Sequence, residues 1–132
     1  MIVQTKQQEP GDTAEEILNS LHYVRPGQGF KPNFQLFAKC DVNGSRELAL
    51  YSFLKASCAP PVDVFLHSDS LGSATNLVYA PLRSDDVRWN FEKFLLDRSG
   101  RVVMRFQHAT EPAQIAPFVE ALLRNEHIPR PK

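Results

Sequence analysis

Residues 88–106, RWNFEKFLLDRSGRVVMRF, decide the fold. Large apolar residues fill 91–96, and apolar side chains alternate with other types over 102–106. Aromatic and branched residues suit a pleated sheet, and Gly100 can take the positive φ that a tight connection needs. The segment therefore predicts a β-hairpin that turns at 97–100 and packs one face on a core.

Trp89 and Asn90 precede this hairpin, and Trp89 is the only tryptophan of the chain. The position can present an indole N–H and a side-chain amide toward solvent or toward a site. A lone tryptophan beside a strand is more often a packing residue. The residues alone leave both interpretations open.

Length and composition restrict the class of protein. The 132 residues fit one domain, and an apolar content of 42% is enough for a core. The formal net charge is zero, so there is no broad field to attract nucleic acid or an anionic membrane. No apolar run approaches the roughly 18–20 residues of a membrane span. The polar start, MIVQTKQQ, is unlike a secretory signal.

The cysteines and histidines suggest no metal centre. Cys40 and Cys58 are the only two cysteines, too few for a disulfide framework or a zinc set. The four histidines are scattered through the sequence. We therefore expect no metal site.

The first half of the chain predicts helix, strand and helix. Thr13 with Glu16 forms a capping-box pattern, and a helical apolar stripe follows. Residues 33–42 alternate like a strand and end at an Asn-Gly turn. Residues 46–57 predict a second helix. The stripe expected to be buried on the first helix comprises Ile17, Leu18, Leu21 and Val24.

The second half adds the hairpin and a last helix. Residues 59–87 carry little signal, and a connection of that length is usually functional, contact-making or mobile. Pro117 suits the first turn of the last helix, where its missing N–H has no cost. The order of helix, strand, helix, hairpin and helix predicts an α/β fold with helices covering one sheet.

Several segments, in order along the chain, resemble the glutathione peroxidases. The similarity covers roughly residues 4–125, with looser patches at 62–86 and 107–116. The segments that carry it are QEPG at 8–11, YVRPGQGF at 23–30, PNFQLF at 32–37, DVNG at 41–44, FLK at 53–55 and WNFEKFL at 89–95.

The resemblance implies a thioredoxin-like fold of the glutathione peroxidase type. In that family the first half is a βαβ unit with the nucleophile at the head of a helix, and no such segment is recognisable here. Residues 1–132 are thus expected to be a single, truncated domain. The motifs look most like the tetrameric, glutathione-using, plasma-type branch, which implies a homo-oligomer and an extracellular location, with a cytoplasmic one as the alternative.

The resemblance also implies the chemistry. A selenol or thiol attacks the peroxide O–O bond, and glutathione regenerates it. The nucleophile works only when ionised, and neighbouring hydrogen-bond donors favour that form. The family's Trp and Asn match Trp89 and Asn90. Its Gln falls at Gln4, although Thr5 and Lys6 stand where the family has Phe-Gly.

Two arginines match those that the family offers to the carboxylates of glutathione, Arg25 and Arg105. Guanidinium binds carboxylate in a bidentate manner. Taken alone, either arginine is better explained as a solvated surface charge. Met104 stands where the family often has a second arginine. Glutathione is a co-substrate, and no cofactor is implied.

Two functional hypotheses follow. The first is a glutathione peroxidase-like protein that reduces hydrogen peroxide and organic hydroperoxides, in which this chain alone is inactive because the nucleophile is absent. Neither Cys40 nor Cys58 sits in a family-like nucleophile motif. The second is a non-catalytic binding or interaction module derived from such an enzyme.

Overall fold

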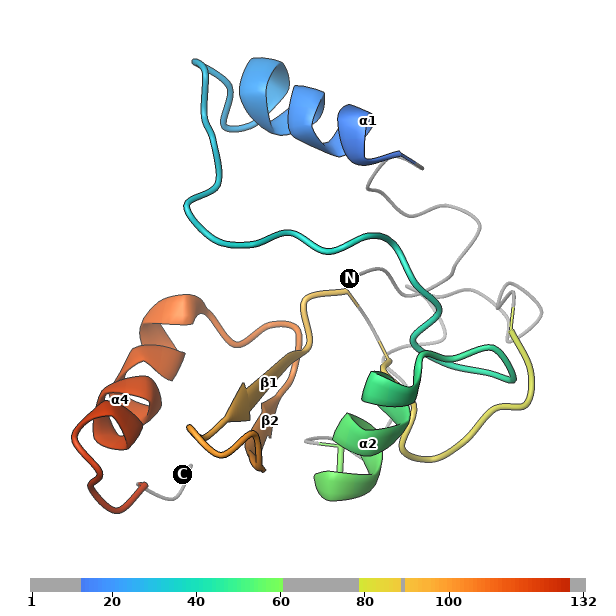
Figure 1. Ribbon diagram of the computed structural model, residues 1–132, viewed down its shortest axis with the longest axis vertical. Helices are drawn as coiled ribbons and strands as arrows, with labels where there is room; N and C mark the ends of the chain where they lie inside the picture. Colours follow the sequence, from blue (N-terminus) through green and yellow to red (C-terminus); the bar gives the residue numbers. More distant parts are fainter. Residues whose placement is uncertain (1–12, 61–78, 89, 129–132) are drawn as a thin grey trace.

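The computed structural model describes residues 13–60, 79–88 and 90–128. In chain order the elements are α1 (Ala14–Asn19), the π-helix η1 (Ser20–Val24), α2 (Ala49–Ser57), β1 (Lys93–Leu96), β2 (Val102–Phe106) and α4 (Pro112–Leu123). In Figure 1 the hairpin lies between α2 and α4, while α1 stands apart above them. Within the described ranges, no helix is long and apolar enough to cross a membrane.

The predicted hairpin is confirmed. β1 and β2 pair antiparallel, with Phe94 opposite Arg105 and a register shift between Leu95 and Leu96. The Asp97 carboxylate accepts hydrogen bonds from the Ser99 and Arg101 backbone N–H groups at 2.9 and 3.1 Å. Gly100 has a φ of 83°. Local side-chain bonds and one glycine therefore close the turn.

The first helix begins as the sequence predicts, but its stripe is not buried. The Glu16 N–H donates to Thr13 Oγ1 and the Thr13 N–H donates to Glu16 Oε2, both at 3.2 Å, which is a complete capping box. No residue of α1 or η1 is buried, and Leu18 and Val24 are exposed. The amphipathic pattern is present, but it produces no fully buried residue in either helix.

The strand expected at 33–42 is wrong. The whole segment lacks helix and strand structure, and the only described sheet is the two-stranded pair of β1 and β2. Phe34 and Phe37 should lie on opposite faces of a strand, yet both are exposed. Alternating side chains do not make a strand unless a neighbour pairs with the backbone.

The last helix starts earlier than expected. Pro112 occupies its first turn, and Glu111 with Gln114 forms the capping box. Pro117 lies inside the helix, where its missing N–H removes an intrahelical hydrogen bond. The expected place of Pro117 was therefore wrong. The second helix is correct, but it begins at Ala49 rather than at residue 46.

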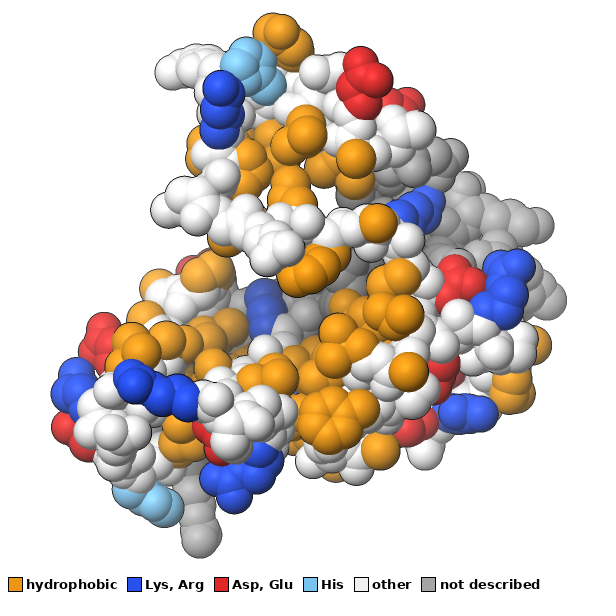
Figure 2. All heavy atoms as spheres, viewed as in Figure 1, with side chains coloured by type: hydrophobic (Ala, Val, Ile, Leu, Met, Phe, Trp, Pro, Cys, Tyr) orange, Lys and Arg blue, Asp and Glu red, His pale blue; other side chains and the backbone are white. Residues whose placement is uncertain are grey.

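The core is small. Val42 and Val87 are fully buried, and Cys40, Tyr51 and Phe94 pack against them. A second contact joins β2 to α4, where the Phe106 and Phe118 rings meet edge to face at 5.4 Å. Figure 2 shows hydrophobic side chains over much of one face of the body and on the underside of the upper part. The expectation of one domain over 1–132 stays a prediction.

Candidate functional site

Residues 83–92 lead into the hairpin and are fixed by buried polar contacts. Asn43 clamps the backbone of Val87, since its Nδ2 donates to the Val87 carbonyl at 2.8 Å and its Oδ1 accepts from the Val87 N–H at 2.9 Å. Both residues are buried. The side-chain amide therefore supplies the two hydrogen bonds that a neighbouring strand would otherwise make.

Lys55 of α2 ties the same segment to the helix. Its Nζ donates to Asp86 Oδ1 at 3.1 Å and to the carboxylate of Glu47. Burial works to raise the pKa of Glu47, but hydrogen bonds from Lys55 and Ser52 outweigh it, so this pKa lies below its usual value. Lys55 and Asp86 are buried, so each depends on its partners for compensation of charge.

Glu92 closes a turn that begins at Arg88 and includes Asn90 and Phe91. Its Oε1 accepts a hydrogen bond from the Arg88 backbone N–H at 2.6 Å. Its Oε2 accepts from Arg105, at 2.8 Å from Nε and 2.7 Å from Nη2. One buried carboxylate thus joins the start of the turn to strand β2.

Arg105 lies differently from the sequence-based expectation. Its side chain has 0% exposure, and it also donates to the carbonyls of Asp85 and Asp86 at 2.9 Å. The guanidinium lies over the Phe94 ring at 5.0 Å. In this arrangement the fork is occupied by the protein itself, so Arg105 is a structural link and does not face a soluble tripeptide.

The residues expected to act on peroxide are only partly described. Asn90 is half-buried within the turn closed by Glu92. Trp89 and Gln4 lie outside the described residues. Phe91 is 75% exposed and has a φ of 63°, a conformation that bulky residues rarely adopt. The turn is therefore held by its surroundings more than by its own preference.

Arg25 belongs to a separate region. It follows η1, is exposed, and donates its backbone N–H to the Ser20 carbonyl at 2.9 Å. Gly27 and Gly29, both with positive φ, shape the loop after it. Figure 1 shows this loop above the hairpin, beside α1. No contact in the described structure joins the Arg25 side chain to the turn at 88–92.

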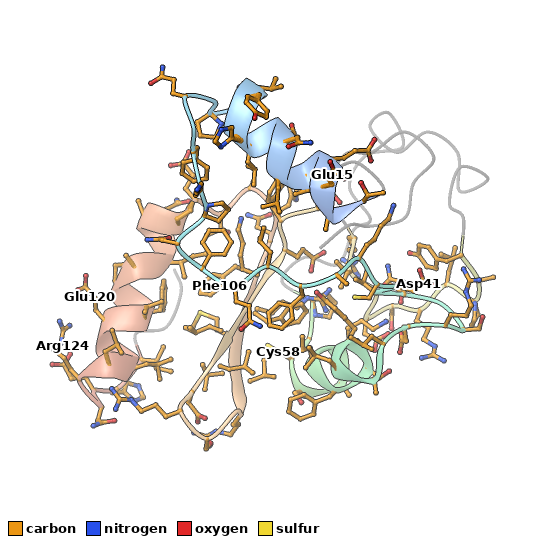
Figure 3. All side chains as sticks on the ribbon, turned by 45° about the horizontal axis from the view of Figure 1, so that its top comes forward. Glu15, Asp41, Cys58, Phe106, Glu120 and Arg124 are labelled. Atoms are coloured by element: carbon orange, nitrogen blue, oxygen red, sulfur yellow. The ribbon has the colours of Figure 1, made fainter. Side chains whose placement is uncertain are left out.

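Both cysteines are half-buried. Cys40 is half-buried against the core and lies near Tyr51, whose pKa is raised to about 12 by burial and by the Cys40 charge. Cys58 follows the last residue of α2 (Figure 3). Both thiols are free. Among the residues that the structure describes, no three His, Cys, Asp or Glu side chains form a metal-binding group.

The arrangement can present hydrogen-bond donors on a rigid base. Buried ion pairs hold the segment from both sides, and the chain between them carries an indole and an amide in sequence. Fixed N–H donors stabilise an anionic nucleophile or a developing negative charge on oxygen. Sequence reasoning missed the residues that build this base, which are Asn43, Lys55, Asp86 and Glu92.

Comparison with known proteins identifies relatives. Residues 2–55 match the sequence profile of the family described as Glutathione peroxidase. The chain is 47% identical over 119 residues to "Glutathione peroxidase 3" of Sapajus apella, covering 90% of this chain and 50% of that protein. It is 52% identical over 103 residues to "Glutathione peroxidase 3" of Bos taurus, covering 78% and 42%.

A solved structure is also similar. "Crystal structure of T. cruzi GPX1" is 31% identical with a TM-score of 0.49, covering 74% of this chain and 51% of that one. The chain spans about half the length of the curated relatives that it matches. The family match confirms the class that the motifs predict, an α/β, thioredoxin-like fold of the glutathione peroxidase type.

Proposed function

This chain is a homologue of the glutathione peroxidases over 90% of its length, and from that premise we propose that it carries part of a hydroperoxide-reducing site that uses glutathione. The observation that carries the proposal is the turn at 88–92. It contains the Trp-Asn pair in sequence, Glu92 binds its first residue, and Asp86, two residues before it, pairs with Lys55. Such a frame keeps donor groups in place without reorganisation.

Trp89 and Asn90 are the proposed donors, with Gln4 as the third. They would bind a selenolate or thiolate and polarise the peroxide. The nucleophile attacks one oxygen, the O–O bond breaks, and the other oxygen leaves as water or alcohol. Two glutathiones then reduce the resulting selenenic or sulfenic acid: their sulfurs join as glutathione disulfide, the oxygen of the acid leaves as water, and the nucleophile is regenerated. Donors that stabilise the ionised nucleophile lower its pKa.

Arg25 is the better candidate for holding glutathione. Its guanidinium is exposed, and glutathione is anionic overall, so a bidentate contact with a carboxylate is accessible. Arg105 contributes to the site through Glu92 in this proposal, because its own donors are used within the protein.

The isolated chain is proposed to lack peroxidase activity. Cys40 packs as a half-buried side chain against Val42 and Val87, Cys58 is the C-cap of α2, and neither lies in a family-like nucleophile motif. Hydrogen peroxide and glutathione supplied to the purified chain in a coupled assay should give only the uncatalysed rate. Turnover well above that rate, lost in Trp89→Phe, would mean that a nucleophile is present in the chain after all.

A hybrid protein tests the function itself. The 119 residues of this chain that match the Sapajus apella protein would replace their counterpart there, and the rest of that protein would keep its own sequence. We expect glutathione-dependent reduction of hydrogen peroxide by the folded hybrid. A folded hybrid without such activity would contradict the proposal.

A second candidate function is a non-catalytic module that binds another polypeptide. It is favoured by the large exposed apolar side chains of the described part, among them Tyr23, Phe34, Phe37 and Phe53. Exposed apolar area of this kind often marks an interface. An inactive hybrid, together with capture of an intact glutathione peroxidase subunit by the chain, would support this candidate.

The proposal includes an extracellular, oligomeric protein of the plasma type. Similarity to two proteins named glutathione peroxidase 3 supports that branch. Fractionation of secreting cells separates this location from the cytoplasmic alternative, and sedimentation of the purified protein gives the oligomeric state.

A further inference from the structure

The carboxylate of Glu92 makes two contacts whose partners lie on either side of the turn. Oε1 takes the Arg88 backbone N–H at 2.6 Å, and Oε2 takes the Arg105 guanidinium at 2.7 and 2.8 Å. The first contact spans four residues along the chain, and the second spans thirteen. Residues 89–91 are the whole of the chain between the two ends of the short span.

Arg105 is itself immobilised. It is paired with Phe94 in the ladder of β1 and β2, its Nη atoms donate to the Asp85 and Asp86 carbonyls at 2.9 Å, and its side chain has no exposure. Strand β2 thus fixes the Glu92 carboxylate through Arg105, and the carboxylate in turn fixes the Arg88 N–H. Each link is buried and charge-assisted, and such bonds are the stronger kind.

The turn does not hold itself. Phe91 sits at a φ of 63° and is 75% exposed, so no packing of its ring stabilises this strained conformation. Loss of the Glu92 bond to Arg88 removes one constraint against relaxation toward ordinary φ values. The native geometry of Asn90 and Phe91 therefore depends on the carboxylate.

We propose that Glu92, fixed by Arg105, is a positioning residue: it binds the Arg88 N–H and so positions Asn90, which lies between Arg88 and Glu92 in the chain. It touches no substrate and acts through the turn. The proposal rests on the proposed function for the role of Asn90, but its test does not require activity. An alternative in which Glu92 only adds stability makes a different prediction.

Trp89 provides the readout, because it is the only tryptophan of the chain and stands between Arg88 and Asn90 in the sequence. The emission maximum of Trp89 and its quenching by acrylamide are measured on the full 132-residue chain without denaturant. Far-UV circular dichroism establishes that each variant is folded. Glu92→Met removes both contacts. Glu92→Gln keeps an oxygen acceptor for the Arg88 N–H but loses the charge.

The matched control is Asp97→Asn. Asp97 also pairs with an arginine and binds backbone N–H groups, but it does so at the other end of the same hairpin. We expect Glu92→Met to shift native Trp89 emission and change its quenching constant. Glu92→Gln should give an intermediate change, and Asp97→Asn should leave the emission as in the parent.

Parent-like emission and quenching in folded Glu92→Met and Glu92→Gln would overturn the positioning role, and so would an equal shift in Asp97→Asn. Should Glu92→Met fail to fold, Glu92→Gln and Arg105→Lys decide the question by the same measurements. A shifted Trp89 emission in the Glu92 variants together with an inactive hybrid would support the positioning role of Glu92 and reject the peroxidase function. Failure of the positioning role and failure of the proposed function are therefore distinguishable.

Discussion

At the scale of single residues, the most consequential finding is that Arg105 is buried. The resemblance assigns it to glutathione, whereas the structure gives its donors to Glu92 and to two backbone carbonyls. Sequence could not reveal this, because the carbonyl contacts join residues 19 and 20 positions apart. The sequence pattern of an arginine on a strand is the same whether its guanidinium faces solvent or the protein interior.

Loss of Arg105 should lower stability strongly. Arg105→Met leaves the Glu92 carboxylate buried without its charge partner, and breaking a buried pair in this way costs about 3–5 kcal/mol. Urea unfolding of the variant checks this. Arg98→Met, at an exposed arginine of the hairpin turn, should cost less than about 1 kcal/mol. Equal effects at the two positions would contradict the structural role of Arg105.

Phe91 offers a test of the strained turn. Phe91→Gly should unfold at the same or a higher urea concentration, because glycine adopts positive φ freely and the lost ring is exposed. Phe91→Val should lose about 1 kcal/mol, since a β-branched side chain is poorly accommodated there. A glycine variant less stable than the valine variant would show that the turn is not strained at this residue.

At the scale of elements, local signals decided what the sequence could predict. The turn at Asp97–Gly100, the capping box of Thr13 and the helix before Pro60 are specified by neighbours a few residues away, and all three are present. The strand at 33–42 depended on a distant pairing partner, which no described segment supplies. Its alternating pattern could not indicate that.

Acid should weaken the hairpin turn. A hydrogen bond from Ser99 is the main cause that lowers the pKa of Asp97 to about 2, with Arg101 adding to it. The unfolded value is about 3.9, so the carboxylate stabilises the turn above about pH 4 and loses that effect as pH falls through about 2. The stability difference between the parent and Asp97→Asn should therefore shrink over this range, as urea midpoints at each pH would measure. A difference that is constant with pH would contradict it.

The α2 helix should depend on Lys55. Lys55→Met leaves Asp86 and Glu47 without their common cation, and the expected loss is about 3–5 kcal/mol. Thermal or urea unfolding measures it, with the exposed Lys31→Met as the control that should change little. Adding Asp86→Asn to Lys55→Met should recover part of the loss. A further loss in the double variant would mean that the charge pair is not the cause.

At the scale of the whole molecule, a network of buried polar contacts, called the polar frame here, holds distant segments together. The frame joins α2, the segment at 83–88 and the hairpin through contacts that span 13 to 44 residues. Sequence could place Asn90 beside a hairpin but could not find Lys55 or Asp86, because charged residues usually predict a solvated face. It could not find Asn43 either, because its partner Val87 lies 44 residues away. The family motifs predicted which residues act on peroxide, and the structure identified the buried polar residues that fix the neighbouring backbone.

The central claim is that the turn at 88–92 activates peroxide. The measurement that tests it most directly is kcat/KM for hydrogen peroxide in the hybrid with the Sapajus apella protein, comparing Asn90→Ala with Asn19→Ala, the same change at an exposed position in α1. We predict that Asn90→Ala lowers kcat/KM by about 10²–10³, as loss of one fixed donor does, while Asn19→Ala leaves it unchanged. Equal kcat/KM values for the two folded variants would contradict the account.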